Sequence, residues 1–299
     1  MTDNAPTFIQ PDLTMNDYIH RNTSSDFRYC FTCKSCATEC PVNIFTGRLN
    51  PARLVRLASF GLKDTLIRLS EIWYCLGCGK CSNICPMNVR PHILISNMCN
   101  EAISNHLFSL EIKKYIFELF LQFQRVRLQL VHMYINGEDI DHRLLEDWDY
   151  LADLPMDNVG EDSTLILGNL QRRSSLGNYK GIPTEIRACL TCRECSNACP
   201  ICLESKVFDP LFLFRAIALG LKDVVVSMPS VWLCIECETC SKSCAQGVKG
   251  HLVMKQLKRM AIESGILDEG FLSRWNNSQR ILFNTLLNKV DLVLERFSL

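Results

Sequence analysis

The chain is 299 residues long, a length that indicates two domains. Its 32 basic and 32 acidic residues cancel, so no overall charge field directs the protein to nucleic acid or to an anionic membrane. Hydrophobic residues make up 47% of the sequence, which is enough for packed cores and excludes general disorder.

Residues 1–26 are interpreted as an N-terminal extension. The stretch from Met1 to Pro6 has no basic segment followed by an apolar one, so we expect no export signal. The 18 cysteines are then expected to stay reduced and to bind metal rather than form disulfides. No run of about 18 or more uncharged apolar residues occurs, so we expect a cytoplasmic protein without a membrane span.

Four cysteine blocks of one design follow along the chain, each with the spacing C-x2-C-x2-C-x3-C. The blocks consist of Cys30, Cys33, Cys36 and Cys40; Cys75, Cys78, Cys81 and Cys85; Cys189, Cys192, Cys195 and Cys199; and Cys234, Cys237, Cys240 and Cys244. Proline follows the first three blocks, whereas Ala245 follows the last. This spacing is typical of the ligands of two-cluster ferredoxins, so the sequence predicts four [4Fe–4S] clusters.

The same spacing predicts how the cysteines divide among the clusters. Short gaps let one loop hold three ligands of a cluster, while the fourth cysteine points away and reaches the neighbouring cluster. The predicted iron-ligand sets are Cys30, Cys33, Cys36 and Cys85; Cys75, Cys78, Cys81 and Cys40; Cys189, Cys192, Cys195 and Cys244; and Cys234, Cys237, Cys240 and Cys199. We expect this crossing to tie the two blocks of each pair together, so that cluster binding contributes to folding.

Other uses of the cysteines fit the sequence less well. Zinc sites use cysteines in pairs and do not normally repeat this four-cysteine run. Cys202 forms a C-x3-C-x2-C spacing with Cys195 and Cys199 that superficially matches the radical-SAM triplet, but no β/α-barrel pattern surrounds it. Cys99 lies outside the blocks and is interpreted as a buried structural cysteine.

The sequence matches itself at a shift of 159 residues. Besides the cysteines, matched pairs include Pro51 and Pro210, Trp73 and Trp232, and His92 and His251. The tryptophans are interpreted as core residues and the histidines as structural hydrogen-bonding groups near the clusters. The repeat predicts two dicluster modules at residues 27–107 and 186–266. An all-α fold is predicted, because apolar residues recur at helical spacing after Pro51 and at 91–106 and 250–265, and because strand signals are weak.

A connector over residues 108–185 is expected between the modules. It begins with an amphipathic helix at about 107–135, whose apolar stripe includes Ile116 and Phe123 and whose charges, among them Glu118 and Arg125, lie opposite. Acidic residues gather between 138 and 162, and we interpret that stretch as a solvated linker. The tail at 267–299 has further apolar residues at helical spacing. We expect it to pack against the second module or to bind a partner.

In each repeat a helical stretch separates two cysteine blocks, and Trp73 or Trp232 stands two residues before the second block. This arrangement resembles the C subunit of heterodisulfide reductase. That family has the α-helical ferredoxin fold with one module, so this chain resembles a tandem duplication of it. The resemblance implies an electron relay between the A subunit, which contains flavin, and the catalytic B subunit, which reduces a disulfide at clusters held by Cys-Cys-Gly motifs. This chain has no Cys-Cys pair, so we expect it to lack that site and to need such partners.

The leading hypothesis is therefore a non-catalytic electron-transfer subunit of a heterodisulfide-reductase-like oxidoreductase. The sequence offers no dinucleotide-binding fingerprint and no nucleophile–base constellation. One alternative is a membrane-associated relay to a quinone-reactive partner, in which the 107–135 helix lies on a membrane or on an integral membrane protein. A second is a redox-sensing iron–sulfur protein, for which four clusters are more than one labile sensor requires.

Overall fold

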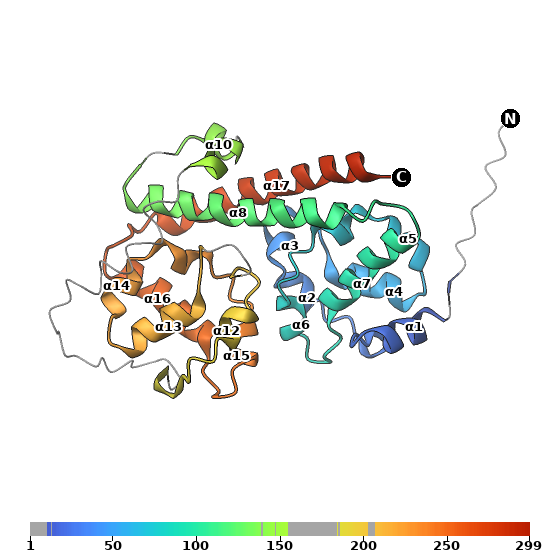
Figure 1. Ribbon diagram of the computed structural model, residues 1–299, viewed down its shortest axis with the longest axis horizontal. Coiled ribbons are helices and arrows are strands. Elements are labelled where there is room, and N and C mark those ends of the chain that lie inside the picture. Colours follow the sequence, from blue (N-terminus) through green and yellow to red (C-terminus); the bar gives the residue numbers. More distant parts are fainter. Residues whose placement is uncertain are drawn as a thin grey trace. The chain divides into compact units, whose positions relative to one another are not determined.

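The computed structural model describes residues 11–154 without 13, 139 and 147, and residues 184, 186–202 and 207–299. Over these ranges the regular secondary structure is helical, apart from one isolated antiparallel bridge between Phe108 and Ser298 (Figure 1). The predicted all-α class is therefore confirmed. The acidic residues from 157 to 162, predicted as part of a linker, lie outside the described residues.

The chain divides into two compact units, and each contains one of the predicted modules. Unit 1 comprises residues 1–113 and 290–299, and unit 2 comprises residues 114–289. The predicted limits of the five segments stay a prediction. Within the described ranges, no helix is both long enough and apolar enough to cross a membrane.

Unit 1 is built from short helices that end or begin at the cysteine blocks. Its elements are α1 (Met15–Asn22), η1 (Phe27–Tyr29), α2 (Ser35–Thr38), α3 (Pro41–Thr46), α4 (Pro51–Ser59), α5 (Lys63–Arg68), η2 (Ser70–Tyr74), α6 (Lys80–Asn83) and α7 (Pro91–Ser104). The last residues of α17 (Phe271–Phe297) also belong to this unit. There, Asp291 accepts hydrogen bonds from Tyr74 at 2.6 Å and from Arg48 at 2.5 Å.

Unit 2 repeats this plan and adds long helices. Its elements are α8 (Ile112–Ile135, from residue 114), α9 (His142–Glu146), α10 (Trp148–Asp153), η3 (Ile186–Ala188), α12 (Glu194–Asn197), α13 (Pro210–Ala218), α14 (Lys222–Val226), η4 (Pro229–Leu233), α15 (Thr239–Lys242), α16 (Gly250–Glu263) and α17 up to residue 289. The predicted helix at 107–135 is thus observed at 112–135. Phe123 of α8 packs against Trp148 and against Phe283 of α17, with ring centroids 5.7 and 4.8 Å apart.

The internal repeat is structural as well as sequential. The helices α4 and α7 correspond to α13 and α16, and their first residues are 159 positions apart. Both α4 and α13 begin with a proline that follows a capping side chain: Asn50 accepts from the Arg53 N–H, and Asp209 accepts from the Leu211 N–H. A polar cap before a proline is a strong signal for a helix start. These caps fix where each helix begins between its two cysteine blocks.

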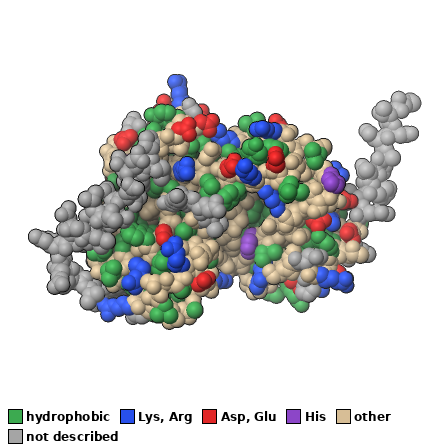
Figure 2. Space-filling view, in the orientation of Figure 1, with side chains coloured by type: hydrophobic (Ala, Val, Ile, Leu, Met, Phe, Trp, Pro, Cys, Tyr) green, Lys and Arg blue, Asp and Glu red, His purple; other side chains and the backbone are tan. Residues whose placement is uncertain are grey.

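On the face shown in Figure 2, Lys and Arg side chains are interspersed with Asp and Glu rather than gathered by sign. The large apolar side chains exposed in the described residues include several beside the cysteine blocks, namely Tyr29, Phe31, Ile84, Met87 and Leu190.

Candidate metal centres

Each C-x2-C-x2-C loop turns sharply because two of its residues adopt the left-handed backbone conformation. These residues are Thr32 and Lys34, Gly77 and Gly79, Thr191 and Arg193, and Glu236 and Glu238. The second residue of each pair is the N-cap of a short helix that carries the third cysteine of its block. The loop can therefore curl its cysteines around one centre. Only the two glycines indicated this geometry in the sequence, since the other residue types rarely adopt positive φ.

The strain at these positions predicts a change of stability with a definite sign. Replacing the exposed Lys34 (φ +65°) with glycine is expected to raise the free energy of unfolding of the cluster-loaded protein by about 0.5–1 kcal/mol, because the Cβ clash disappears. Replacing Gly79 (φ +72°) with alanine is expected to lower it by a similar amount, about 1 kcal/mol. Anoxic denaturant titration measures the free energy of unfolding of both variants. If both variants were stabilised, or both destabilised, the assignment of strain to these positions would be wrong.

Four cavities bring the cysteines together, and each is lined by cysteines of both blocks of one module. We number them by chain order of the block that supplies three cysteines. Cavity 1 is lined by Cys30, Cys33, Cys36 and Cys85; cavity 2 by Cys75, Cys78, Cys81 and Cys40; cavity 3 by Cys189, Cys192, Cys195 and Cys244, with Cys240; and cavity 4 by Cys234, Cys237, Cys240 and Cys199. The structure thus groups the cysteines as the crossed spacing predicts; that they ligate iron stays a prediction.

The cavities differ in size and in depth. Cavities 1, 2 and 4 each have a volume of about 20 Å³, whereas cavity 3, which includes Ala245 in its lining, has about 110 Å³. Cys33 of cavity 1 and Cys192 of cavity 3 are exposed, while Cys81 of cavity 2 and Cys237 of cavity 4 are buried. Each module therefore has one cavity near the surface and one deeper cavity.

The electrostatics of the cavities suit thiolates that share a positively charged group. Burial and the neighbouring thiolates, Cys81 first, raise the pKa of Cys36 to about 12. Burial and the thiolates of Cys234 and Cys237 likewise raise the pKa of Cys240 to about 12. Thiols packed this way resist losing their protons unless a cation is bound among them, because a bound metal reverses that preference. The donor set and its packing therefore fit an iron–sulfur cluster.

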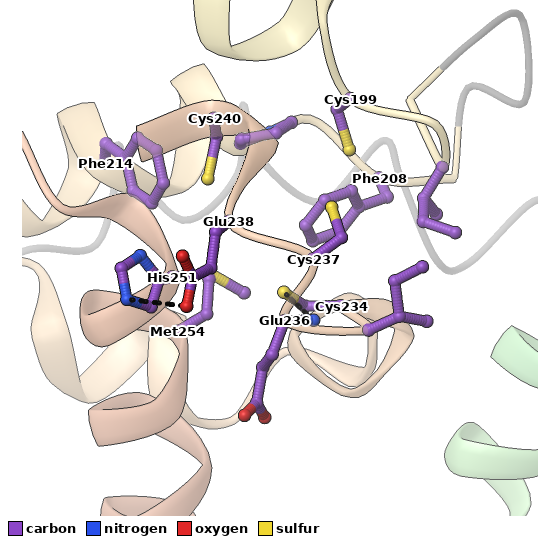
Figure 3. A pocket seen from close by; sticks show the side chains of 13 residues that line it. Cys199, Phe208, Phe214, Cys234, Glu236, Cys237, Glu238, Cys240, His251 and Met254 are labelled. Atoms are coloured by element: carbon purple, nitrogen blue, oxygen red, sulfur yellow. Dashed lines mark hydrogen bonds and ion pairs between the residues drawn. The ribbon is translucent and has the colours of Figure 1, made fainter. Parts of the chain in front are cut away.

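Cavity 4 shows this arrangement in detail. The side chains of Cys199, Cys234, Cys237 and Cys240 surround a common space, and the Glu236 carboxylate points away from it (Figure 3). His251 also lines the cavity, with its Nδ1 2.6 Å from the Ser241 hydroxyl and its Nε2 3.8 Å from the Glu238 carboxylate.

The repeated histidines and tryptophans have matching places in the two units. His92 lines cavity 2, and its Nδ1 lies 2.5 Å from the Ser82 hydroxyl, as His251 does with Ser241. Trp73 and Trp232 are both buried, and each meets a phenylalanine edge-to-face, at 5.2 Å from Phe108 and 4.5 Å from Phe271. The interpretation of both pairs as structural groups is consistent with these contacts.

The two cysteines outside the blocks do not line the cavities. Cys99 is buried, and its thiol donates to the Ile72 carbonyl at 3.3 Å, as a structural cysteine would. Cys202 is half-buried and absent from the lining of all four cavities. Across the residues that the structure describes, no group of three or more His, Cys, Asp and Glu side chains is arranged to hold a single metal ion.

Comparison with known proteins gives the same assignment. The 4Fe-4S dicluster domain family matches residues 29–90, and a second family of that description matches residues 185–248. The C subunit of the H(2):CoB-CoM heterodisulfide,ferredoxin reductase of Methanothermobacter marburgensis is 32% identical over 107 residues, which are 36% of this chain and 57% of that protein. The iron-sulfur C subunit of the CoB--CoM heterodisulfide reductase of Methanopyrus kandleri is 29% identical over 82 residues, 27% of this chain and 42% of that protein.

The matches are partial, since the chain spans about half the length of these relatives or less. None of the solved structures matches the chain significantly. The helical fold, the tandem dicluster domains and the relatives nevertheless agree. The chain therefore contains two 4Fe-4S dicluster domains and is similar to the iron–sulfur C subunits of heterodisulfide reductases.

Proposed function

We propose that this protein is an electron-transfer subunit that carries four [4Fe–4S] clusters. The observation that carries the proposal is the grouping of sixteen cysteines into four cavities, each lined by cysteines of both blocks of its module. We propose these sixteen cysteines as the iron ligands, in the crossed sets given above. Each bound cluster would supply a centre that accepts and releases one electron at a time.

The depth of the cavities supports a relay within each module. Clusters at cavities 1 and 3 would lie near the surface, where the exposed Cys33 and Cys192 are found, and would exchange electrons with a partner protein. Clusters at cavities 2 and 4 would be shielded by Trp73 and Trp232, the buried residues that precede their loops. Shielding from solvent is one of the factors that separate the potentials of neighbouring clusters.

We further propose two partners: a flavin-containing protein similar to the A subunit of heterodisulfide reductase, and a Cys-Cys-Gly protein similar to its B subunit. The names of the relatives, each the C subunit of a heterodisulfide reductase, support a multisubunit complex. The absence of any Cys-Cys pair in this sequence supports a catalytic site in another chain. We place the complex in the cytoplasm. A membrane-associated relay is less favoured, because Phe123, Val126 and Leu130 of α8 are buried inside unit 2.

Anoxic purification with iron and sulfide analysis tests the proposal. We expect about sixteen iron atoms and sixteen sulfides per chain, as four cubane clusters require. A count near eight, or zinc in place of iron, would overturn the four-cluster assignment. Purification of the native complex should then yield a flavoprotein and a Cys-Cys-Gly protein; a complex with neither would overturn the proposed partners and leave the cluster count standing.

A further inference from the structure

Arg127, on α8 in unit 2, is an arginine held in the interior with no carboxylate partner among the residues that the structure describes. Its exposed fraction is 4%. Its guanidinium donates to the side-chain oxygens of Gln279 and Gln124, each at 2.8 Å, and to the Leu233 carbonyl at 3.3 Å. The centroids of the Phe123 and Trp275 rings lie 5.5 and 5.7 Å from the Arg127 Cζ atom. All these partners in the described part of the chain are neutral.

A buried charge without a counter-charge is costly, so proteins rarely retain one. Burial lowers the pKa of Arg127 to about 10, and the nearby Cys234 thiolate opposes this. A guanidinium with that pKa remains charged at neutral pH. A source of negative charge lies close by in cavity 4, because Leu233, which accepts from Arg127, is bonded directly to Cys234. The anionic group that Arg127 faces is thus the sulfur-rich lining of that cavity.

A second cation beside cavity 4, Lys258, is already neutralised. Lys258 donates to the Cys234 carbonyl at 2.7 Å and to the Glu236 carboxylate at 2.8 Å. Lys258 and Glu236 therefore cancel as an ion pair, and Arg127 remains as the unbalanced positive charge in this set.

The matching region of unit 1 is balanced in a different way. Cys99 stands at the repeat position of Lys258, and Tyr74 at that of Leu233. The Tyr74 hydroxyl accepts from Arg48 at 2.8 Å, but Arg48 forms an ion pair with Asp291. The duplicated modules have thus diverged in charge at the approach to their deeper cavities.

We propose that Arg127 is the buried counter-charge of the cluster bound in cavity 4 and raises the reduction potential of that cluster. This inference rests on the proposed function, because it needs a cluster in cavity 4. An electron added to the cluster increases its negative charge, and a fixed cation in a low-dielectric interior stabilises the reduced form more than the oxidised form. Arg127 thereby makes the deeper cluster of unit 2 easier to reduce than it would otherwise be.

The test is an anoxic redox titration of the full, cluster-loaded chain, followed by electron paramagnetic resonance. Arg127→Gln removes the charge, and we expect one cluster to become about tenfold harder to reduce, a shift of about 59 mV for one electron. Gln279→Glu keeps Arg127 but replaces the amide that accepts its 2.8 Å hydrogen bond with a carboxylate, which neutralises the guanidinium. We expect the reduction potential of the same cluster to shift in the same direction. Among the residues that the structure describes, the side-chain nitrogen of Gln279 has no hydrogen-bond partner, so this substitution breaks no hydrogen bond there. Arg127→Lys should hold the potential near its original value.

Lys289→Gln is the matched control, since it removes a cation of unit 2 that is paired with Asp149 at 2.8 Å. We expect no shift for it. Unshifted potentials in Arg127→Gln and Gln279→Glu, with about sixteen iron atoms bound, would overturn the inference and leave the proposed function intact. If Arg127→Gln does not fold, Gln279→Glu alone decides. A wild-type protein with too little iron to fill cavity 4 would instead overturn the proposed function.

Discussion

Replacement of Cys40 with alanine is expected to remove one cluster and to destabilise unit 1 selectively. Cys40 belongs to the first block but lines cavity 2 with the three cysteines of the second block's loop. It is buried, and burial raises the pKa of its thiol, so its thiolate needs a bound metal for stabilisation. Without it the cluster in cavity 2 lacks its fourth ligand, and the tie between the two blocks is lost.

The expected result is an iron content of about twelve instead of sixteen, with earlier thermal unfolding of unit 1, because metal binding in such sites is coupled to folding. Iron analysis and hydrogen exchange followed by mass spectrometry measure the two effects separately. Cys99→Ser is the matched control: this cysteine is equally buried in the same unit but donates to a backbone carbonyl, which serine can also do. Full iron in Cys40→Ala, or lost iron in Cys99→Ser, would refute the crossed assignment.

The grouping of the cysteines was predictable because it is local and geometric. The distance between cysteines along the chain limits which sulfurs can face one centre, and the 159-residue repeat applies that limit twice. The helices that begin at Pro51 and Pro210 were predictable for the same reason, since their apolar residues recur at helical spacing. The helix starts and the three cysteines of each loop depend on neighbours in sequence, and the fourth cysteine, which comes from the other block, follows from the ferredoxin spacing.

The conformation of the loops was not predictable from residue type. Glu236 and Glu238 adopt positive φ in unit 2 where Gly77 and Gly79 do so in unit 1. The path of the loop around its cavity overrides the preference of glutamate for negative φ, at a cost of roughly 1–2 kcal/mol per residue. Backbone strain of this kind is held at sites where the surrounding structure fixes it.

The burial of Arg127 was not predicted from the sequence. Arg127 lies four residues after Phe123 and three before Leu130, on the apolar stripe of the 107–135 helix, and it is buried there as a charged residue. Periodicity assumes that one face of the helix packs and the other meets water. Residues 126–131 of α8 are instead all buried, so this part of the helix has neighbours on more than one side, and Arg127 reaches Leu233. The contact between Arg127 and Leu233 depends on tertiary structure that a single helix cannot reveal.

Replacement of Gly250 with alanine is expected to destabilise unit 2, although alanine ordinarily favours a helix by about 1 kcal/mol over glycine. Gly250 is the first residue of α16. A Cβ atom there would lie 2.5 Å from a ring carbon of Phe214 and 2.9 Å from the sulfur of Cys240, too close for either. Overpacking of this kind costs about 1–3 kcal/mol, so the clash outweighs the gain in helix propensity.

Unit 1 shows how the same fold accommodates a side chain at this position. Pro91 is the repeat counterpart of Gly250, and Val55 is the counterpart of Phe214. Both Val55 and Pro91 line cavity 1, whereas Phe214 lines cavities 3 and 4. In unit 1 the small side chain of Val55 on α4 is thus paired with the Pro91 ring at the start of α7. In unit 2 the large Phe214 ring on α13 is paired with Gly250, which has no side chain, at the start of α16.

This exchange predicts a coupling between the two positions of unit 2. Gly250→Ala alone should lower the free energy of unfolding and speed cluster loss, and Phe214→Val alone should also destabilise by opening a cavity. The double variant should recover part of both losses, because the valine makes room for the new Cβ, giving a favourable coupling energy of about 0.5–3 kcal/mol. Anoxic unfolding of the four proteins, followed through cluster absorbance, measures that energy. Additive losses would show that the Phe214 ring moves aside freely and that Gly250 is not held by packing.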